Sequence, residues 1–113
     1  MIRGGIYYEA APSSKERKGV IMSGRPVVLV SPRPWGDVVQ VVPLTTSAKR
    51  RTDGFPHHIP VRLGDEENVA LCEQVRTVDR SYLRKWPIGV VSTQTLGEID
   101  TQLKRILGLE GES

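Results

Sequence analysis

One arginine stands where a polar loop enters a strongly apolar run. Arg25 lies between Gly24 and Pro26, and residues 26–31 read PVVLVS. The proline has a fixed backbone angle, so a guanidinium just before it can be aimed from a well-anchored position. A phosphate is the ligand that such a forked donor binds best. The alternative is an arginine that only extends its charged end into solvent at a strand start, and spacing alone leaves both interpretations open.

Three hydroxyl side chains follow the next apolar run. Thr45, Thr46 and Ser47 come directly after the letters VVPL, and the basic triplet at 49–51 begins after one alanine. Hydroxyls and free backbone N–H groups at the end of a strand can hold a phosphate. Serine and threonine also favour turns through hydrogen bonds to their own backbone, without any ligand. These residues are therefore candidates for a phosphate site or for a simple turn.

A third polar cluster interrupts the apolar stretch VALCEQVRTV at residues 69–78. The alternation of a strand would put Glu73 on one face, and Gln74 with Arg76 on the other. A carboxylate on a buried segment rarely lacks a role, because burying an unpaired charge is costly. Glu73 is therefore a candidate general base, or else the ionic partner of an arginine such as Arg25.

His57, His58 and Cys72 are the other side chains suited to acid–base or nucleophilic chemistry. The histidines lie between Pro56 and Pro60 where a loop enters a strand, and Cys72 is expected to be a small buried strand residue. One cysteine and two histidines are too few for the usual structural zinc site. The sequence also lacks a phosphate-binding loop, a dinucleotide fingerprint and a Ser-His-Asp pattern, so we expect no metal and no cofactor.

The elements that would position these residues are mostly short strands. Apolar, β-branched runs separated by turn residues predict strands at residues 5–10, 26–31, 37–44, 58–63, 69–78 and 88–91. The second run is continuous, as in a central strand buried on both faces, while Pro43 indicates an edge or bulge in the third. Polar loops are expected at 11–24 and 45–55 and an acidic turn at 64–68, and Asp79 can cap a short helical turn over 79–85.

The C-terminal segment changes from strand periodicity to helix periodicity. An apolar face with helical spacing is formed by Leu96, Ile99, Leu103, Ile106 and Leu107. Ser92 is a suitable N-cap, and Gly108 is a suitable residue just after the last turn. Together the pattern predicts a mostly β (α+β) fold, a small curled antiparallel barrel, partly closed, with a C-terminal α-helix packed on it.

Length and charge limit the classes of protein to which this chain can belong. The chain has 113 residues, which suits one domain over 1–113, and no apolar run approaches the roughly 18 residues of a membrane span. The start MIRGG lacks the apolar stretch of a signal peptide, so we expect a soluble, cytoplasmic protein. The net charge of +3 is uneven, because residues 1–51 carry nine Lys/Arg and three Asp/Glu while residues 52–113 carry seven and ten. A basic half suits a polyanion such as a nucleic acid, and solvated surface charge is the alternative explanation.

In this order, these segments resemble the MazF/PemK family of toxin endoribonucleases, which belong to type II toxin–antitoxin systems. The resemblance runs along nearly the whole chain, through RGGIYY, GRPVVLVS, VVPLTTS, FPHHIPV, ALCEQVRTVD and a terminal helix ending ILGL. It implies an SH3-barrel-like curled antiparallel sheet with a C-terminal helix. It also implies a homodimer that cuts single-stranded RNA at short sequences without a metal and is neutralised by the C-terminal segment of an antitoxin.

The resemblance suggests a role for each candidate residue. Arg25 of GRPV and Thr45 at the end of VPLT match the usual catalytic pair of the family. Glu73 is the expected general base, in preference to either histidine, and the products would be a 2′,3′-cyclic phosphate and a 5′-hydroxyl. With the hydroxyl and basic side chains considered above, the residues expected to contact RNA are Thr46, Ser47, Lys49, Gln74 and Arg76.

The chain departs from the family pattern in two places. The loop before Arg25 reads SSKERKGVIMSG rather than Gly/Glu-rich, and Leu71 stands where some plasmid-borne relatives carry a catalytic arginine. The alternative function on the same fold is a non-catalytic toxin that binds and poisons a protein target such as DNA gyrase, which would not need Arg25 and Thr45 together. Because the basic half of the chain contains Arg25, an antitoxin that competes with RNA is expected to have an acidic binding tail.

Overall fold

Seven short strands and one long helix make up most of the described chain. The structure is a computed structural model, and it describes residues 1–10, 25–47 and 56–109. The strands are β1 (Gly5–Glu9), β2 (Arg25–Leu29), β3 (Val38–Thr45), β4 (His58–Leu63), β5 (Glu66–Leu71), β6 (Arg76–Asp79) and β7 (Gly89–Val90). The helices are the 3-10 turns η1 (Cys72–Gln74) and η2 (Arg80–Tyr82) and the C-terminal helix α2 (Thr93–Ile106). The predicted mostly β fold with one terminal helix is confirmed, and outside residues 64–79 the strand ends are shifted by at most two residues.

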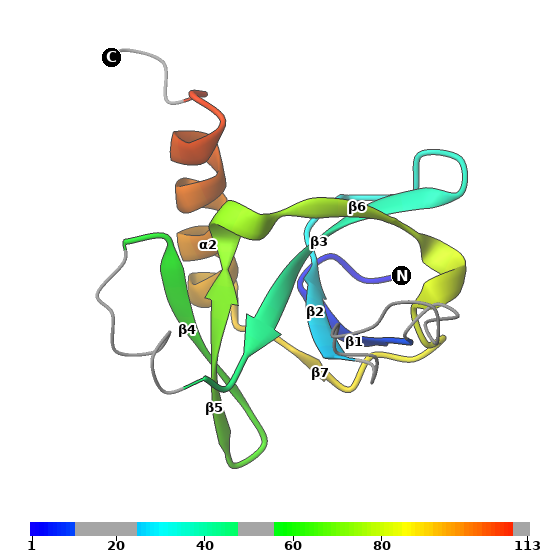
Figure 1. The fold of residues 1–113 in the computed structure, drawn as a ribbon, viewed down its shortest axis with the longest axis horizontal. Coiled ribbons are helices and arrows are strands. Elements are labelled where there is room, and N and C mark those ends of the chain that lie inside the picture. The colour runs from blue at the N-terminus through cyan, green and yellow to red at the C-terminus, as the bar shows by residue number, and fades with distance from the viewer. Residues whose placement is uncertain (11–24, 48–55, 110–113) are drawn as a thin grey trace, which may run out of the picture.

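The strands form an antiparallel sheet in the order β4-β5-β3-β2-β1-β7, and β6 also pairs with β3. The first half of β3 pairs with β6, and the end of β3 pairs with β5. The same edge of this one long strand therefore forms hydrogen bonds with two different strands. This arrangement lets the sheet curl, with β4 and β5 on one side and β6 on the other (Figure 1).

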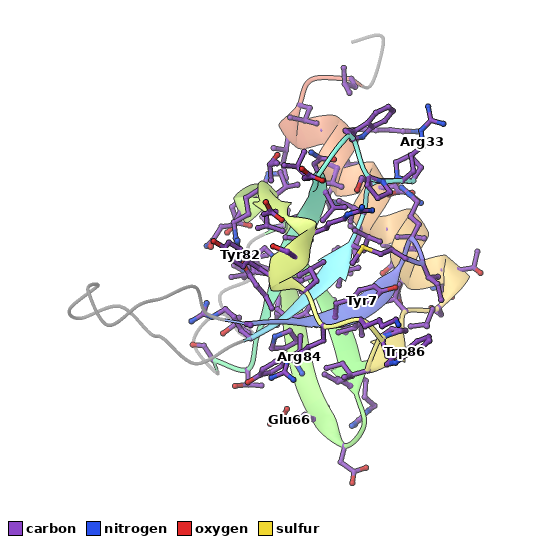
Figure 2. The ribbon with its side chains drawn as sticks, turned by 90° about the vertical axis from the view of Figure 1, so that its right-hand side faces the viewer. Tyr7, Arg33, Glu66, Tyr82, Arg84 and Trp86 are labelled. Atoms are coloured by element: carbon purple, nitrogen blue, oxygen red, sulfur yellow. The ribbon has the colours of Figure 1, made fainter. Side chains whose placement is uncertain are left out.

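The segment that follows β6 returns alongside β1 and closes the curl. The N–H of Arg84 donates to the carbonyl of Tyr8 at 2.9 Å, and Leu83 forms an isolated bridge with Glu9. Tyr82, Arg84 and Trp86 lie along this returning segment (Figure 2). The result is the small, partly closed antiparallel barrel that the strand pattern predicts.

Two apolar clusters lie on opposite faces of the sheet. In β2, Val28 belongs to the cluster that contains Ile99 of α2, whereas Val27 and Leu29 belong to the cluster inside the curl. These three β2 residues are at most 1% exposed. The continuous apolar run of β2 is therefore buried on both faces, as its sequence predicts.

The helix α2 begins and ends at the expected residues. The N–H of Thr95 donates to the hydroxyl of Ser92 at 3.0 Å, and Gly108 follows the last turn with φ +71°. Leu103 packs against the cluster that contains Ile99. Leu107 was expected on the same face but is 60% exposed, because the helix ends one residue before it. No helix in the described ranges is long and apolar enough to cross a membrane.

The prediction of one strand over residues 69–78 is wrong. β5 and β6 pair with β3 in registers that differ by three residues, as the pairs Thr45–Val69 and Val41–Arg76 show. The 3-10 turn η1 takes up the additional residues and carries the chain from one half of β3 to the other. The alternation of faces expected along this segment is therefore broken at η1.

The structure also tests three smaller predictions made from the sequence, which concern a turn, a helix cap and a proline. Only two residues, beginning with Gly64 at φ +62°, connect β4 to β5, so the turn predicted over 64–68 is shorter than expected. Asp79 does cap η2, since its carboxylate accepts from the N–H of Ser81 at 2.9 Å. Pro43 lies within a central strand, at the point where the partner of β3 changes from β6 to β5. The expected loop at 11–24 and residues 48–55 of the second loop lie outside the described residues.

Candidate active site

Two of the predicted catalytic residues lie at the same end of two adjacent strands, where β2 begins and β3 ends. β2 and β3 pair in the register that joins Val27 to Pro43. The paired residues of these two strands end there, and the same register counted two residues further along each strand sets Arg25 level with Thr45. Side chains two residues apart in a strand share a face, so Arg25 lies on the face of Val27 and Thr45 lies on the face of Pro43. The site is the end of the curl where β2 begins and β3 ends.

Arg25 is the cation of this site. It is partly buried, and Pro26 next to it pairs with Tyr8 of β1. Among the described residues, its side chain makes no hydrogen bond or ion pair, so the pairing with Glu73 that the sequence allows is not seen there. A guanidinium on a paired strand with its donors unused can receive an oxyanion.

Thr45 is a turn residue whose hydroxyl accepts a hydrogen bond. Its hydroxyl oxygen accepts from the N–H of Ser47 at 3.2 Å, as in the turn that the sequence allows. A hydroxyl has one donor hydrogen besides its acceptor lone pairs, so this bond leaves the Thr45 hydrogen for another oxygen. Thr46 and Ser47 follow at the surface, and Lys49 lies outside the described residues.

Glu73 and Gln74 lie in η1, on a different part of the fold. The Glu73 carboxylate lies 3.3 Å from Nε2 of His58, and the Gln74 amide donates to it at 3.4 Å. The His58 side chain is only 5% exposed. Val69 is the strand partner of Thr45, and Glu73 comes four residues after it, beyond the end of β5. The described contacts therefore connect Glu73 to His58, and the strand register does not place it level with Arg25 and Thr45.

Arg76 reaches the site from β6, and its partner is a residue that the sequence analysis missed. Its two terminal nitrogens lie 2.5 and 3.1 Å from the two carboxylate oxygens of Glu9. Glu9 is 8% exposed, and its backbone lies opposite that of Arg25 in the pairing of β1 with β2. In the sequence, Glu9 is recognisable as a charged residue at the end of an apolar strand, two positions after Tyr7, which is buried.

The remaining candidates have structural contacts. Nδ1 of His57 lies 2.9 Å from the amide oxygen of Gln102, which ties the start of β4 to α2. Cys72 is buried as predicted, and burial, followed by the negative charge of Glu73, raises the pKa of its thiol to about 12. Within the described ranges, no three His, Cys, Asp or Glu side chains gather as they would around a metal ion.

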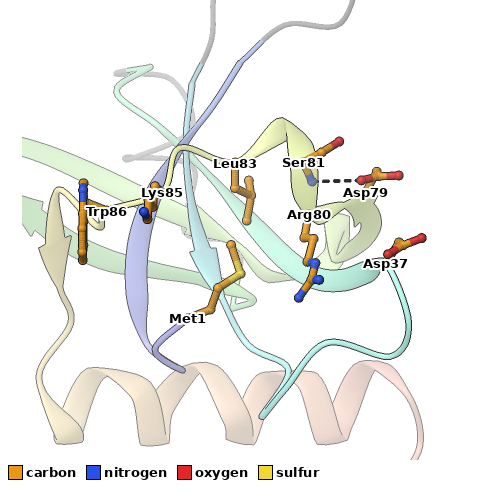
Figure 3. A pocket seen from close by; sticks show the side chains of 8 residues that line it. All are labelled: Met1, Asp37, Asp79, Arg80, Ser81, Leu83, Lys85 and Trp86. Carbon is orange, nitrogen blue, oxygen red and sulfur yellow. Dashed lines mark hydrogen bonds between the residues drawn. The ribbon is translucent and has the colours of Figure 1, made fainter.

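A hollow of about 760 Å³ opens near the start of β3 (Figure 3). It contains none of the predicted site residues, and Asp79 in its wall pairs with Val38, at the opposite end of β3 from Thr45. Hydrogen bonds from Ser81 lower the pKa of the Asp79 carboxyl. The full lining is Met1, Asp37, Asp79, Arg80, Ser81, Leu83, Lys85 and Trp86.

Comparison with known proteins gives the same fold. No curated protein sequence matches this chain significantly. MazF from Deinococcus radiodurans superposes with a TM-score of 0.72 at 21% identity, covering 96% of both chains. The MazE-MazF complex of that organism gives 0.74 at 22% identity, covering 97% of both. An endoribonuclease from a mycobacterial species, solved with its cognate antitoxin, gives 0.68 at 21% identity, covering 99% of this chain and 97% of that one.

The sequence itself carries the family assignment. A profile of the PemK-like, MazF-like toxins of type II toxin–antitoxin systems matches residues 2–107, which is nearly the whole chain. The match spans every described strand and the helix α2. This chain therefore belongs to the family of PemK-like, MazF-like toxins of type II toxin–antitoxin systems.

Proposed function

We propose that this chain is a toxin endoribonuclease that cleaves single-stranded RNA without a metal ion, with Arg25 and Thr45 acting on the reacting phosphate. The observation that supports this most directly is the pairing of β2 with β3, whose register, continued from Val27 and Pro43, sets Arg25 level with Thr45 at the end of the curl. Arg25 has no partner among the described residues, and Thr45 keeps a hydroxyl hydrogen, so both can donate to phosphate oxygens.

In the proposed reaction, the ribose 2′-oxygen attacks the adjacent phosphorus. The bond between that oxygen and phosphorus forms, and the bond from phosphorus to the 5′-oxygen breaks, leaving a 2′,3′-cyclic phosphate and a 5′-hydroxyl. Negative charge grows on the non-bridging oxygens in the transition state. Arg25 stabilises this charge and Thr45 donates to one of these oxygens, while the 5′-oxygen takes its proton from water.

Glu73 is the proposed base that receives the proton of the 2′-hydroxyl. Its carboxylate lies 3.3 Å from Nε2 of His58, a contact that orients it. Because Glu73 lies beyond β5 rather than level with Thr45, it reaches the reacting nucleotide less directly than Arg25 does. We therefore expect Glu73→Gln to slow cleavage less than Arg25→Ala.

Further contacts to RNA and to proteins complete the proposal. We place Thr46, Ser47, Lys49, Gln74 and Arg76 along the path of the RNA strand. The protein would act in the cytoplasm as a homodimer, inhibiting translation and growth, and would be neutralised by an antitoxin with an acidic C-terminal segment. Antitoxin-bound relatives among the similar structures support the last of these partners.

The test is cleavage of a long RNA in the presence of EDTA, with every cut end mapped by sequencing. The wild-type protein should cut at a short recurring sequence and leave cyclic phosphate ends, and Arg25→Ala should abolish the cuts. Arg33→Ala is the matched control, because Arg33 is an exposed arginine stacked 4.9 Å from the Trp35 ring on the turn before β3. Intact RNA together with binding to a topoisomerase would instead favour a toxin that poisons a protein target.

A further inference from the structure

Glu9 is a buried carboxylate at the edge of the candidate active site. It is 8% exposed, ends strand β1, and pairs with Arg25 across β1 and β2. On its other side it forms the isolated bridge with Leu83 of the returning segment. A carboxylate in such a position needs a strong partner, because an unpaired buried charge is costly.

The partner of Glu9 is Arg76, and the geometry is bidentate. Each carboxylate oxygen receives one terminal nitrogen of the guanidinium, at 2.5 and 3.1 Å. The two side chains are unequally covered, with 10% of the Glu9 side chain and 40% of the Arg76 side chain exposed. The carboxylate is therefore the inner, anchored group, and the guanidinium is the outer group that faces solvent.

The pair spans the curl between strands that are not neighbours. β6 pairs with β3, and β1 pairs with β2 and β7, so only side chains connect Glu9 to Arg76. A guanidinium has five N–H donors in a rigid fork, and a bidentate carboxylate uses two of them. Among the described residues the other three donors of Arg76 have no acceptor, and Arg76 is held by Glu9, the strand partner of Arg25.

We propose that Glu9 is a positioning residue, which holds Arg76 so that its remaining donors form a second phosphate site beside Arg25. The inference rests on the proposed function, since the ligand is the backbone of the single-stranded RNA. It assigns Arg25 to the reacting phosphate and Arg76 to the neighbouring one. Glu9 itself does not touch the RNA.

The direction in which RNA affinity changes when Glu9 is replaced distinguishes a positioning residue from a residue with no role in binding. A carboxylate near a phosphate repels it, so removing an idle Glu9 would strengthen RNA binding, most clearly at low salt. Removing a positioning Glu9 frees Arg76 to adopt many rotamers, so binding weakens and cleavage slows although a negative charge is lost. The two roles therefore predict opposite changes.

The experiment compares Glu9→Gln with Asp100→Asn. The control carboxylate also pairs with an arginine far away in the sequence, Arg3, at 2.6 Å, but it lies on α2. For each protein we would measure the single-turnover cleavage rate at saturating RNA. We would also measure affinity for the same strand with 2′-deoxyribose at the cut site, which cannot be cleaved, at several salt concentrations.

We expect Glu9→Gln to slow cleavage by about tenfold or more and to weaken binding of the uncleavable strand several-fold. Glu9→Asp should recover part of the cleavage rate and part of the affinity. In Asp100→Asn, both quantities should stay within about twofold of wild type. If Glu9→Gln does not fold, Arg76→Lys in the wild-type background should show the same losses, because lysine keeps the charge but not the fork.

Two results would contradict the inference, and they can be told apart. Wild-type protein that cuts RNA, with Glu9→Gln binding as tightly or more tightly and cutting as fast, would overturn the role of Glu9 alone. Wild-type protein that neither binds the uncleavable strand nor cuts RNA would overturn the proposed function and this inference with it. Wild-type protein that binds but does not cut would remove only the nuclease assignment, and the affinities would still decide the role of Glu9.

Discussion

At the residue scale, the candidate site depends on which donors remain unused after the fold has formed. Arg76 uses two donors on Glu9, and Thr45 accepts one bond from Ser47 but keeps its hydroxyl hydrogen. Arg25 has no partner among the described residues. If these three side chains form the proposed site, their donors are the groups that would contact a phosphate backbone.

The hydroxyl of Thr45 can be tested separately from its shape. Thr45→Val removes the donor but keeps a β-branched side chain of similar volume, and we expect single-turnover cleavage to fall by about a hundredfold. Thr45→Ser keeps the hydroxyl and should retain most of the activity. Thr77→Val is the matched control, because Thr77 on β6 is exposed and accepts a hydrogen bond from Gln40 at 3.2 Å. Equal activities of Thr45→Val and the control would contradict the role of the hydroxyl.

At the element scale, the β4–β5 hairpin contains a polar side chain that its position does not explain. Asn68 is 2% exposed and lies opposite Val61, which belongs to the cluster packed against α2. Its amide nitrogen is buried and finds no hydrogen-bond partner among the described residues. A buried donor without a partner costs roughly 1–3 kcal/mol.

Replacing this side chain should therefore stabilise the hairpin. We expect Asn68→Val to raise the free energy of unfolding by about 1 kcal/mol, because it removes the unpaired amide and introduces a strand-favouring residue. Denaturant unfolding monitored by circular dichroism measures the change. Asn68→Asp is the opposite control and should destabilise the protein, since it places a charge at the same buried position. A loss of stability in Asn68→Val would show that the amide has a hydrogen-bond partner outside the described residues.

At the scale of the whole molecule, Cys72 reports on the integrity of the fold. The residue is buried where η1 meets the sheet, and burial and the nearby Glu73 raise the pKa of its thiol from 9.0 to about 12. A thiol must lose its proton before it reacts, so the folded protein should be almost inert to alkylation at pH 8. Reaction should then require unfolding.

Alkylation by iodoacetamide measures this directly. We expect the labelling rate of the folded protein at pH 8 to follow the unfolding equilibrium, and we expect rapid labelling in concentrated urea. The raised pKa has a second consequence, because the unfolded chain loses the proton more easily. The free energy of unfolding should therefore fall as the pH rises from about 9 towards 12. Fast labelling in the absence of denaturant would contradict the buried position of Cys72.

The sequence alone determined the parts of this protein that depend on local information. The strand runs outside residues 64–79, the Ser92 cap and the glycine after α2 are set by residues within a few positions of one another, and the structure confirms them. Family membership also follows from short motifs in a fixed order, and the family match over residues 2–107 confirms it. The same motifs suggested Arg25 and Thr45, whose catalytic roles stay a prediction.

Only the tertiary structure decided the contacts between distant segments. The three-residue shift between β5 and β6 depends on how both strands pair with β3, so the local pattern of residues 69–78 could not reveal η1. The Glu9–Arg76 pair joins residues 67 positions apart, and Glu73 meets His58 rather than Arg25 for the same reason. Side-chain partners follow from the strand register, and the register is set by the packing of the whole sheet rather than by any one strand.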